Sequence, residues 1–226
     1  MSLSKALVCF ALLLFTTSAA HADGTTTMVF TGVNGVSNGV YYVSPYTGVM
    51  NAGSANAQPV ALFCDDINNE VYVGEVWQAN VTNMATGNFA NTRYGNGSVN
   101  ANLGGKNPQV LYEEAAWIVS QFAPHSGDYV SLQYALWDLM SPNAEPTNYA
   151  GSDGITVSQW LTWAASNYTQ INPANFSIVT NVGPLAYKGQ VQEFIVPTPE
   201  PAAIVLMLVG MGVALLLVRR RQQQFA

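Results

Sequence analysis

Residues 109–140 read QVLYEEAAWIVSQFAPHSGDYVSLQYALWDLM, and this stretch decides the class of fold. Apolar side chains recur there at spacings of three and four residues in two blocks, 109–122 and 129–140, a pattern typical of helices with one buried face. A third block with the same spacing covers 157–168. The apolar positions of the three blocks are Val110, Leu111, Ala115, Ile118 and Phe122; Leu132, Ala135, Leu136 and Leu139; and Val157, Trp160, Leu161 and Ala164. We therefore expect three helices here.

Strands are predicted on both sides of these helices, because apolar and polar residues alternate there. The predicted strands are 28–33, 40–44, 60–66, 71–77, 176–180 and 190–196. Residues 67–70 are expected to form a hairpin turn, and the stretch 83–106, rich in Asn and Gly, a long loop. The order of strands, helices and strands predicts an α+β fold, with antiparallel strands and a cluster of helices in one extracellular domain at 23–194.

The chain has 226 residues, of which only 9% are charged, against about 25% in an average soluble domain. Asn, Thr, Ser and Gly supply the polarity instead, which favours an extracellular module over a cytosolic enzyme. Between Asp23 and Glu193 there are twelve acidic and three basic residues, a formal charge of −9. A body this acidic is a poor candidate for binding nucleic acid, so we expect no nucleic-acid partner.

The N-terminus has the three parts of a secretory signal peptide. Lys5 precedes an apolar run at 6–15, and small residues follow at Ala20 and Ala22. The run is too short to span a bilayer, and the small residues predict cleavage after Ala22. We assign 1–22 to a signal peptide, which removes Cys9 and leaves a mature chain that begins at Asp23.

The C-terminus is predicted to be a membrane segment with a basic end. A Pro-rich linker at 195–201 precedes the apolar segment 202–218, which is about long enough for a transmembrane helix. The tail 219–226 begins with Arg219, Arg220 and Arg221, which favour a cytoplasmic position. A permanent single-pass anchor is one interpretation of this arrangement.

A second interpretation follows from the order Pro199, Glu200, Pro201, then the apolar segment, then the arginines at the chain end. This order resembles the PEP-CTERM sorting signal of Gram-negative bacteria. The resemblance implies processing by an exosortase in the inner membrane and delivery to the cell surface or the exopolysaccharide matrix. The membrane helix would then be a temporary sorting signal rather than a permanent anchor.

Cys64 is the single cysteine that remains after removal of the signal peptide. A lone cysteine in an exported protein has three interpretations. It is buried and inert, it forms an intermolecular disulfide, or its sulfur is covalently occupied within the chain.

The residues around Cys64 and a later glutamine resemble the bacterial thioester domain of surface adhesins. Phe63 precedes Cys64, and residues 132–137 read LQYALW, a second match to that family. The resemblance implies that Cys64 and Gln133 form an internal thioester. The residues that match the frame of the motif are Phe63, Leu132, Ala135, Leu136 and Trp137.

The chemistry of a thioester requires these two residue types, because a thiol is the nucleophile and a carboxamide the acyl donor. Trp137 lies four residues after Gln133, on the same helix face, where it is expected to shield the bond from water. An amine on a surface partner would then attack the carbonyl and form a stable amide. The expected function is a covalent surface tether that needs no cofactor and is not an enzyme.

Two alternatives remain open. The chain is a non-covalent structural component of the exopolysaccharide matrix with an inert Cys64, or it is a secreted cysteine enzyme that uses His125 and an acid such as Asp138. Residues 65–70 are rich in oxygen ligands, but a calcium loop that begins at Asp66 would have Val71 and Trp77 where it requires Gly and Glu. The sequence has no zinc pattern, and we expect no metal site.

Overall fold

The computed structural model describes residues 23–95, 103–183 and 191–198, together with Gly212. The expected signal peptide, the sorting motif and the arginine cluster lie outside the described residues. The expected membrane helix at 202–218 lies outside them too, apart from Gly212. Within the described part of the chain, every helix is too short or too polar to cross a bilayer.

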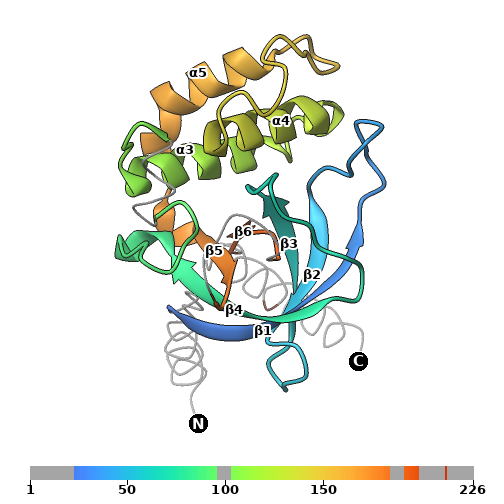
Figure 1. Cartoon of the computed structure of the whole chain (residues 1–226), viewed down its shortest axis with the longest axis vertical. Helices are drawn as coiled ribbons and strands as arrows, with labels where there is room; N and C mark the ends of the chain where they lie inside the picture. Colours follow the sequence, from blue (N-terminus) through green and yellow to red (C-terminus); the bar gives the residue numbers. More distant parts are fainter. Residues whose placement is uncertain (1–22, 96–102, 184–190, 199–211, 213–226) are drawn as a thin grey trace, which may run out of the picture. The chain divides into compact units, whose positions relative to one another are not determined.

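Six antiparallel strands form a closed barrel in the order β1-β2-β3-β6-β5-β4, with β4 pairing back to β1. Figure 1 shows this barrel in the lower part of the view. The strands are β1 Gly24–Val33, β2 Tyr46–Met50, β3 Gln58–Cys64, β4 Val76–Asn83, β5 Phe176–Asn181 and β6 Phe194–Pro197. The first strand begins directly after Asp23, the residue expected to start the mature chain.

Alternate residues of the strands point into the barrel and fill it with aromatic and sulfur-containing side chains. Phe194 lies at the centre of this packing, with its ring within 6.4 Å of the rings of Phe30, Tyr46 and Trp77. Gly48 of β2 permits the tight fit, because a Cβ there would lie 2.7 Å from a Leu62 methyl carbon. The barrel therefore has a packed interior.

Three helices pack against one another beside the barrel, as Figure 1 shows. They are α3 Pro108–Gln121, α4 Tyr129–Met140 and α5 Val157–Asn167. Asn107 caps α3 and Pro108 occupies its first turn, while Thr156 and Gln159 form a capping box on α5. The three predicted helices and the α+β class are confirmed, and the closure of the strands into a barrel was not foreseen.

The helices contact the barrel mainly through β3 and β6. Phe63 of β3 packs edge-on against Phe122 at the end of α3, with ring centroids 4.9 Å apart. Helix α4 contacts β3 at the same end. The two sequence segments with the chemically informative residues, β3 and α4, are therefore neighbours in space.

Three predictions about the strands are wrong. Residues 40–44 are not a strand, because the Asn38 side chain accepts hydrogen bonds from the backbone of Val40 and Tyr41 and so forms a local turn. Residues 71–75 are a turn stabilised by a hydrogen bond from Glu75 N to Tyr72 O, and β4 begins only at Val76. Residues 67–70 do not close a hairpin, because β3 and β4 are not paired.

The last strand also changes the boundary of the body. The domain was expected to end at residue 194 and the linker to begin at 195. In the structure, β6 continues to Pro197 and Thr198 N donates to Asn175 O at 2.8 Å. The compact unit ends at Thr198, so the first residues of the expected linker belong to the barrel.

Candidate functional site

Cys64 and Gln133 lie together where β3 meets α4. Both residues are 0% exposed to solvent. The Gln133 side-chain amide Nε2 donates to the backbone oxygen of Cys64 at 2.6 Å. These residues are 69 positions apart in the chain, and the packing of α4 on the end of β3 brings them together.

Ser44 contacts both residues. Its backbone N–H donates to the Gln133 carbonyl oxygen Oε1 at 3.0 Å, and its hydroxyl accepts from the Cys64 backbone N–H at 2.9 Å. The Gln133 carboxamide is therefore fixed at both its oxygen and its nitrogen. A backbone N–H directed at a carbonyl oxygen polarises that carbonyl, and it stabilises negative charge on the oxygen during nucleophilic attack.

The sulfur of Cys64 has two hydrogen-bonding neighbours among the described residues. The Trp137 indole Nε1 donates to Sγ at 3.4 Å, and the thiol donates to the backbone oxygen of Asp66 at 3.3 Å. Burial raises the pKa of the Cys64 thiol far above its usual value, and the nearby Asp66 carboxylate adds to this effect. The thiol is therefore neutral at physiological pH.

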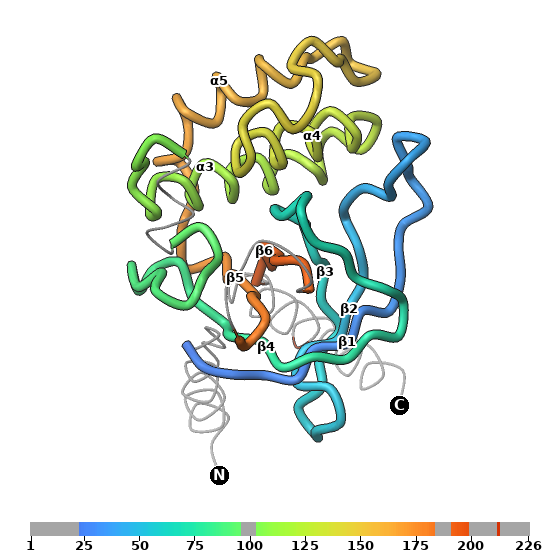
Figure 2. Tube along the Cα trace, in the orientation of Figure 1, coloured from blue at the N-terminus to red at the C-terminus, as the bar shows by residue number. Residues whose placement is uncertain are grey.

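A segment between β1 and β2 packs against α4 beside this site, and Figure 2 shows the trace of this segment near α4. The ring of Tyr41 packs edge-on against Trp137 at 6.0 Å, and Asn38 Nδ2 donates to the Tyr134 hydroxyl at 3.0 Å. We call residues 34–45 the covering segment. The segment and Trp137 together exclude solvent from Cys64 and Gln133.

The other residues of the expected motif frame are buried on the same two elements. They are Phe63 on β3 and Leu132, Ala135 and Leu136 on α4. Phe63 packs against α3, and the three residues of α4 belong to the hydrophobic core. The structure therefore places every predicted residue of the body site on β3 or α4, in the buried interior.

A buried ionic cluster lies directly beside Cys64. Arg93 Nε lies 2.9 Å from Asp66 Oδ2, and the Arg93 backbone N–H donates to Glu193 at 2.7 Å. Glu193 also accepts from the hydroxyls of Tyr112 and Thr180. Because Asp66 O accepts from the Cys64 thiol, the ion pair between Arg93 and Asp66 fixes the turn that orients the sulfur.

Asp65 is the unusual member of this cluster. It is fully buried, and neither of its carboxylate oxygens has a hydrogen-bond partner among the described residues. Burial raises the pKa of Asp65 well above its usual value, and the nearby charges of Glu193 and Asp66 raise it further. One guanidinium faces three carboxyl groups, so we assign Asp65 as the protonated one.

The residues of the alternative cysteine-enzyme triad do not gather at Cys64. The hydrogen bonds of the Cys64 sulfur within the described chain are those to Trp137 and Asp66. His125 instead lies 3.2 Å from Asp153, and its ring packs on Trp160. Asp138 is buried on α4, and its oxygen Oδ1 has no described partner.

An open groove of about 690 Å³ lies on another part of the barrel surface. Carboxylate and amide side chains line it, with Tyr72 at its edge; among them are Glu70, Glu75, Gln78 and Asn68. Tyr72 is 66% exposed. Polar acceptors next to an exposed aromatic ring are suited to a hydroxyl-rich ligand.

Sequence reasoning missed Ser44, Arg93 and Glu193. Ser44 contacts Gln133 through its backbone N–H, for which the residue type gives no signal. Arg93 had one usable signal, since it is one of three basic residues in a body with twelve acids. A cation that rare is a reasonable candidate for a buried ion pair.

One comparison with known proteins identifies part of the chain. The family model described as PEP-CTERM protein-sorting motif matches residues 197–222. This range includes Pro199, Glu200 and Pro201 together with the three arginines, and it begins where β6 ends. The chain therefore carries a motif that exosortase recognises, which implies an exported surface protein that is anchored in a membrane for sorting.

The match covers the sorting motif and none of the helical site. Comparison of the chain with curated proteins and with solved structures finds no significant match. The function of the body is therefore inferred from its own residues and their geometry.

Proposed function

We propose that the body is an adhesion module in which Cys64 and Gln133 form an internal thioester that tethers the protein covalently to an amine-bearing surface partner. The observation that carries this proposal is the Gln133 carboxamide held against Cys64 in a fully buried site. Trp137, one helical turn after Gln133, contacts the sulfur of the same cysteine. The sorting motif supplies the surface location that such a function needs.

Formation of the bond balances without an external reagent. The Cys64 sulfur attacks the Gln133 side-chain carbon, the C–N bond breaks, and the carboxamide nitrogen leaves as ammonia. The neutral thiol supplies the proton that the leaving nitrogen requires. The Ser44 N–H at the carbonyl oxygen stabilises the charge that develops there during the attack.

In the reaction with a partner, the thiol of Cys64 is the leaving group and no longer the nucleophile. An amine attacks the same carbonyl carbon, the C–S bond breaks, and the thiol of Cys64 is restored while a stable amide forms on Gln133. Water would perform the same attack, so the site must exclude bulk solvent until the partner arrives. The covering segment and the Trp137 ring meet this requirement.

Methylamine tests the reactivity of the site, because it is small enough to enter a closed pocket. The full-length chain in detergent should gain one methylamide, located on Gln133 by peptide mass spectrometry, with release of a free thiol. Cys64→Ala and Gln133→Glu should each abolish the adduct, since the first removes the leaving thiol and the second removes the ammonia that must be lost.

The matched control is Gln170→Ala, which removes an exposed glutamine. This variant should label like the wild type, because exposure alone does not activate a carboxamide. Equal thermal unfolding midpoints would show that the Cys64→Ala variant is folded. A wild-type chain that takes up no methylamine, or takes it up equally at Gln170, would overturn the proposal.

The polar groove favours a second candidate function, non-covalent attachment to the exopolysaccharide matrix. Its carboxylate and amide side chains and the exposed Tyr72 suit hydroxyl-rich saccharides. On this account Cys64 is an inert core residue. The two functions differ in the methylamine experiment, because a saccharide-binding module with an inert cysteine forms no adduct.

A further inference from the structure

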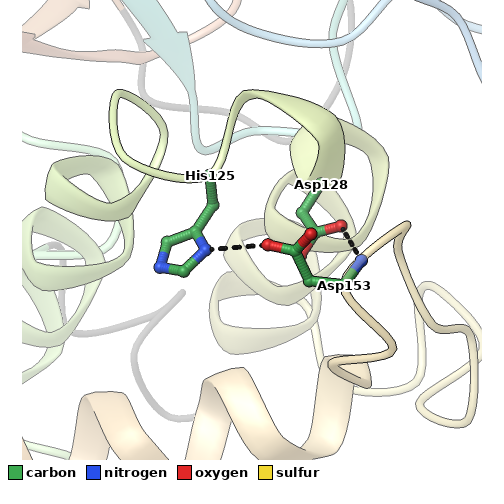
Figure 3. Close-up of side chains that lie close together, drawn as sticks. All are labelled: His125, Asp128 and Asp153. Atoms are coloured by element: carbon green, nitrogen blue, oxygen red, sulfur yellow. Dashed lines mark hydrogen bonds and ion pairs between the residues drawn. The ribbon is translucent and has the colours of Figure 1, made fainter.

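Three side chains of metal-ligating type meet at the start of α4, and none of their described interactions involves Cys64 or Gln133. His125, Asp128 and Asp153 each direct one ligand atom to the same place, and these atoms lie within 4.8 Å of one another. Figure 3 shows the His125 ring directed toward the two neighbouring carboxylates. His125 precedes the short 3-10 helix η3 (Ser126–Asp128), Asp128 is the last residue of that helix, and Asp153 comes from the loop between α4 and α5.

The loop is held closely onto Asp128. The Asp128 oxygen Oδ1 accepts from Ser152 Oγ at 3.1 Å and from the Asp153 backbone N–H at 3.0 Å. Gly151 permits this approach, because a Cβ there would lie 2.1 Å from Asp128 Oδ1. The His125 ring is fixed by its contact with Trp160, with ring centroids 5.1 Å apart. The three ligand side chains are therefore positioned by their surroundings.

The second carboxylate oxygen of Asp128 indicates that this cluster is incomplete. Asp128 is 0% exposed, and its oxygen Oδ2 is buried without a hydrogen-bond partner among the described residues. A buried carboxylate oxygen of this kind is costly unless a proton donor or a cation satisfies it. Arg93 and Lys106, the basic residues in the described body, pair with Asp66 and Glu114 instead.

We propose that His125, Asp128 and Asp153 bind a divalent transition-metal ion, with Zn²⁺ as the representative ion. An imidazole nitrogen and two carboxylate oxygens suit zinc, whereas calcium and magnesium prefer oxygen ligands alone. Zinc ligands lie about 2.0–2.2 Å from the ion, so the ligand atoms must draw together slightly. The Asp153 side chain is 53% exposed and has room to turn inward. Water completes the coordination.

The bound ion would fasten the loop at residues 151–153 to the start of α4. Helix α4 also carries Gln133 and Trp137, so the ion stabilises the element that presents the buried carboxamide. This site does not depend on the thioester, because none of its three ligands contacts Cys64 or Gln133 among the described interactions.

Zinc titration tests the proposal directly. The full-length chain in detergent, treated with a chelator and dialysed, should bind one equivalent of Zn²⁺ by calorimetry and unfold at a higher temperature when loaded. Co²⁺ in place of zinc should give a visible d–d absorption band. His125→Gln and Asp153→Asn should each weaken zinc binding by about tenfold or more.

The control is Glu145→Gln, which changes a partly exposed acid in the same loop outside the cluster. It should bind zinc like the wild type. All variants should unfold at the metal-free wild-type temperature when chelated, which separates lost binding from lost folding. No binding by the wild type, or equal binding by His125→Gln, Asp153→Asn and the wild type, which would indicate an adventitious ion only, overturns the proposal.

Discussion

At the scale of single residues, Cys64 is surrounded by groups that control its reactivity. Its backbone contacts Ser44 and Gln133, and its sulfur contacts Trp137 and the carbonyl of Asp66. The pairing of Cys64 with Gln133 was expected from the resemblance to thioester domains, and the structure places the two in contact. The thioester bond itself stays a prediction.

The buried carboxyl group of Asp65 should make the free energy of unfolding depend on pH. Its pKa in the folded chain is well above the unfolded value of about 3.9. Above about pH 4 the unfolded chain loses a proton that the folded chain keeps, so the free energy of unfolding falls as pH rises toward the folded pKa. The slope for one such proton is at most about 1.4 kcal/mol per pH unit.

Asp65→Asn should therefore give a protein whose stability falls less steeply as the pH rises above the unfolded pKa of about 4. Urea denaturation at several pH values measures this slope. Glu70→Gln, which neutralises an exposed acid, is the control and should keep the wild-type slope. Identical slopes in Asp65→Asn and the wild type would contradict the assignment of a protonated buried Asp65.

At the scale of elements, the helices were predictable and some strands were not. The three helices have long apolar repeats and local caps, so their bounds differ from the predicted ones by at most one residue. Residues 40–44 have strand-like composition, yet the Asn38 side chain captures two of their backbone N–H groups. Competition of this kind between a local turn and a strand ladder is not visible in an alternating pattern.

The sequence pattern could not predict the closure of the barrel either. Strand pairing between β1 and β4 or between β3 and β6 joins segments far apart in the chain, and alternation identifies a strand without identifying its neighbours. The same limit applies to the site. The sequence indicated the helix that carries Gln133, but the role of Ser44 depends on how the covering segment packs on that helix.

At the scale of the whole molecule, a barrel-and-helix body ends at Thr198, and the sorting motif begins at residue 197. The compact unit and the matched motif overlap at residues 197 and 198. The body is strongly acidic, with its charge supplied by twelve acids against three basic residues. This arrangement suits a protein that leaves the cytoplasm, is sorted at a membrane and acts outside the cell.

We expect the C-terminal tail to be removed from the surface-located protein. Replacing Glu200 and Pro201 with Ala should retain the full-length chain in the membrane fraction, because exosortase recognition of the motif is lost. Surface protein from the wild type should lack Arg219–Arg221 by C-terminal mass mapping. Gln224→Ala, beyond the matched residues, is the control and should be processed normally.

Surface protein that still carries the three arginines would show that the tail is a permanent anchor. Normal processing of the Glu200 and Pro201 variant would show that these two residues are not needed for recognition.

Intact mass spectrometry of freshly purified, never-reduced protein tests the central claim most directly. Thioester formation between Cys64 and Gln133 expels ammonia, so the chain should be lighter than its sequence mass by one ammonia molecule. Cys64→Ala and Gln133→Glu should each show the full mass of their own sequences, because either change removes one partner of the bond. A wild-type chain at full sequence mass, with a free thiol on Cys64, would contradict the account.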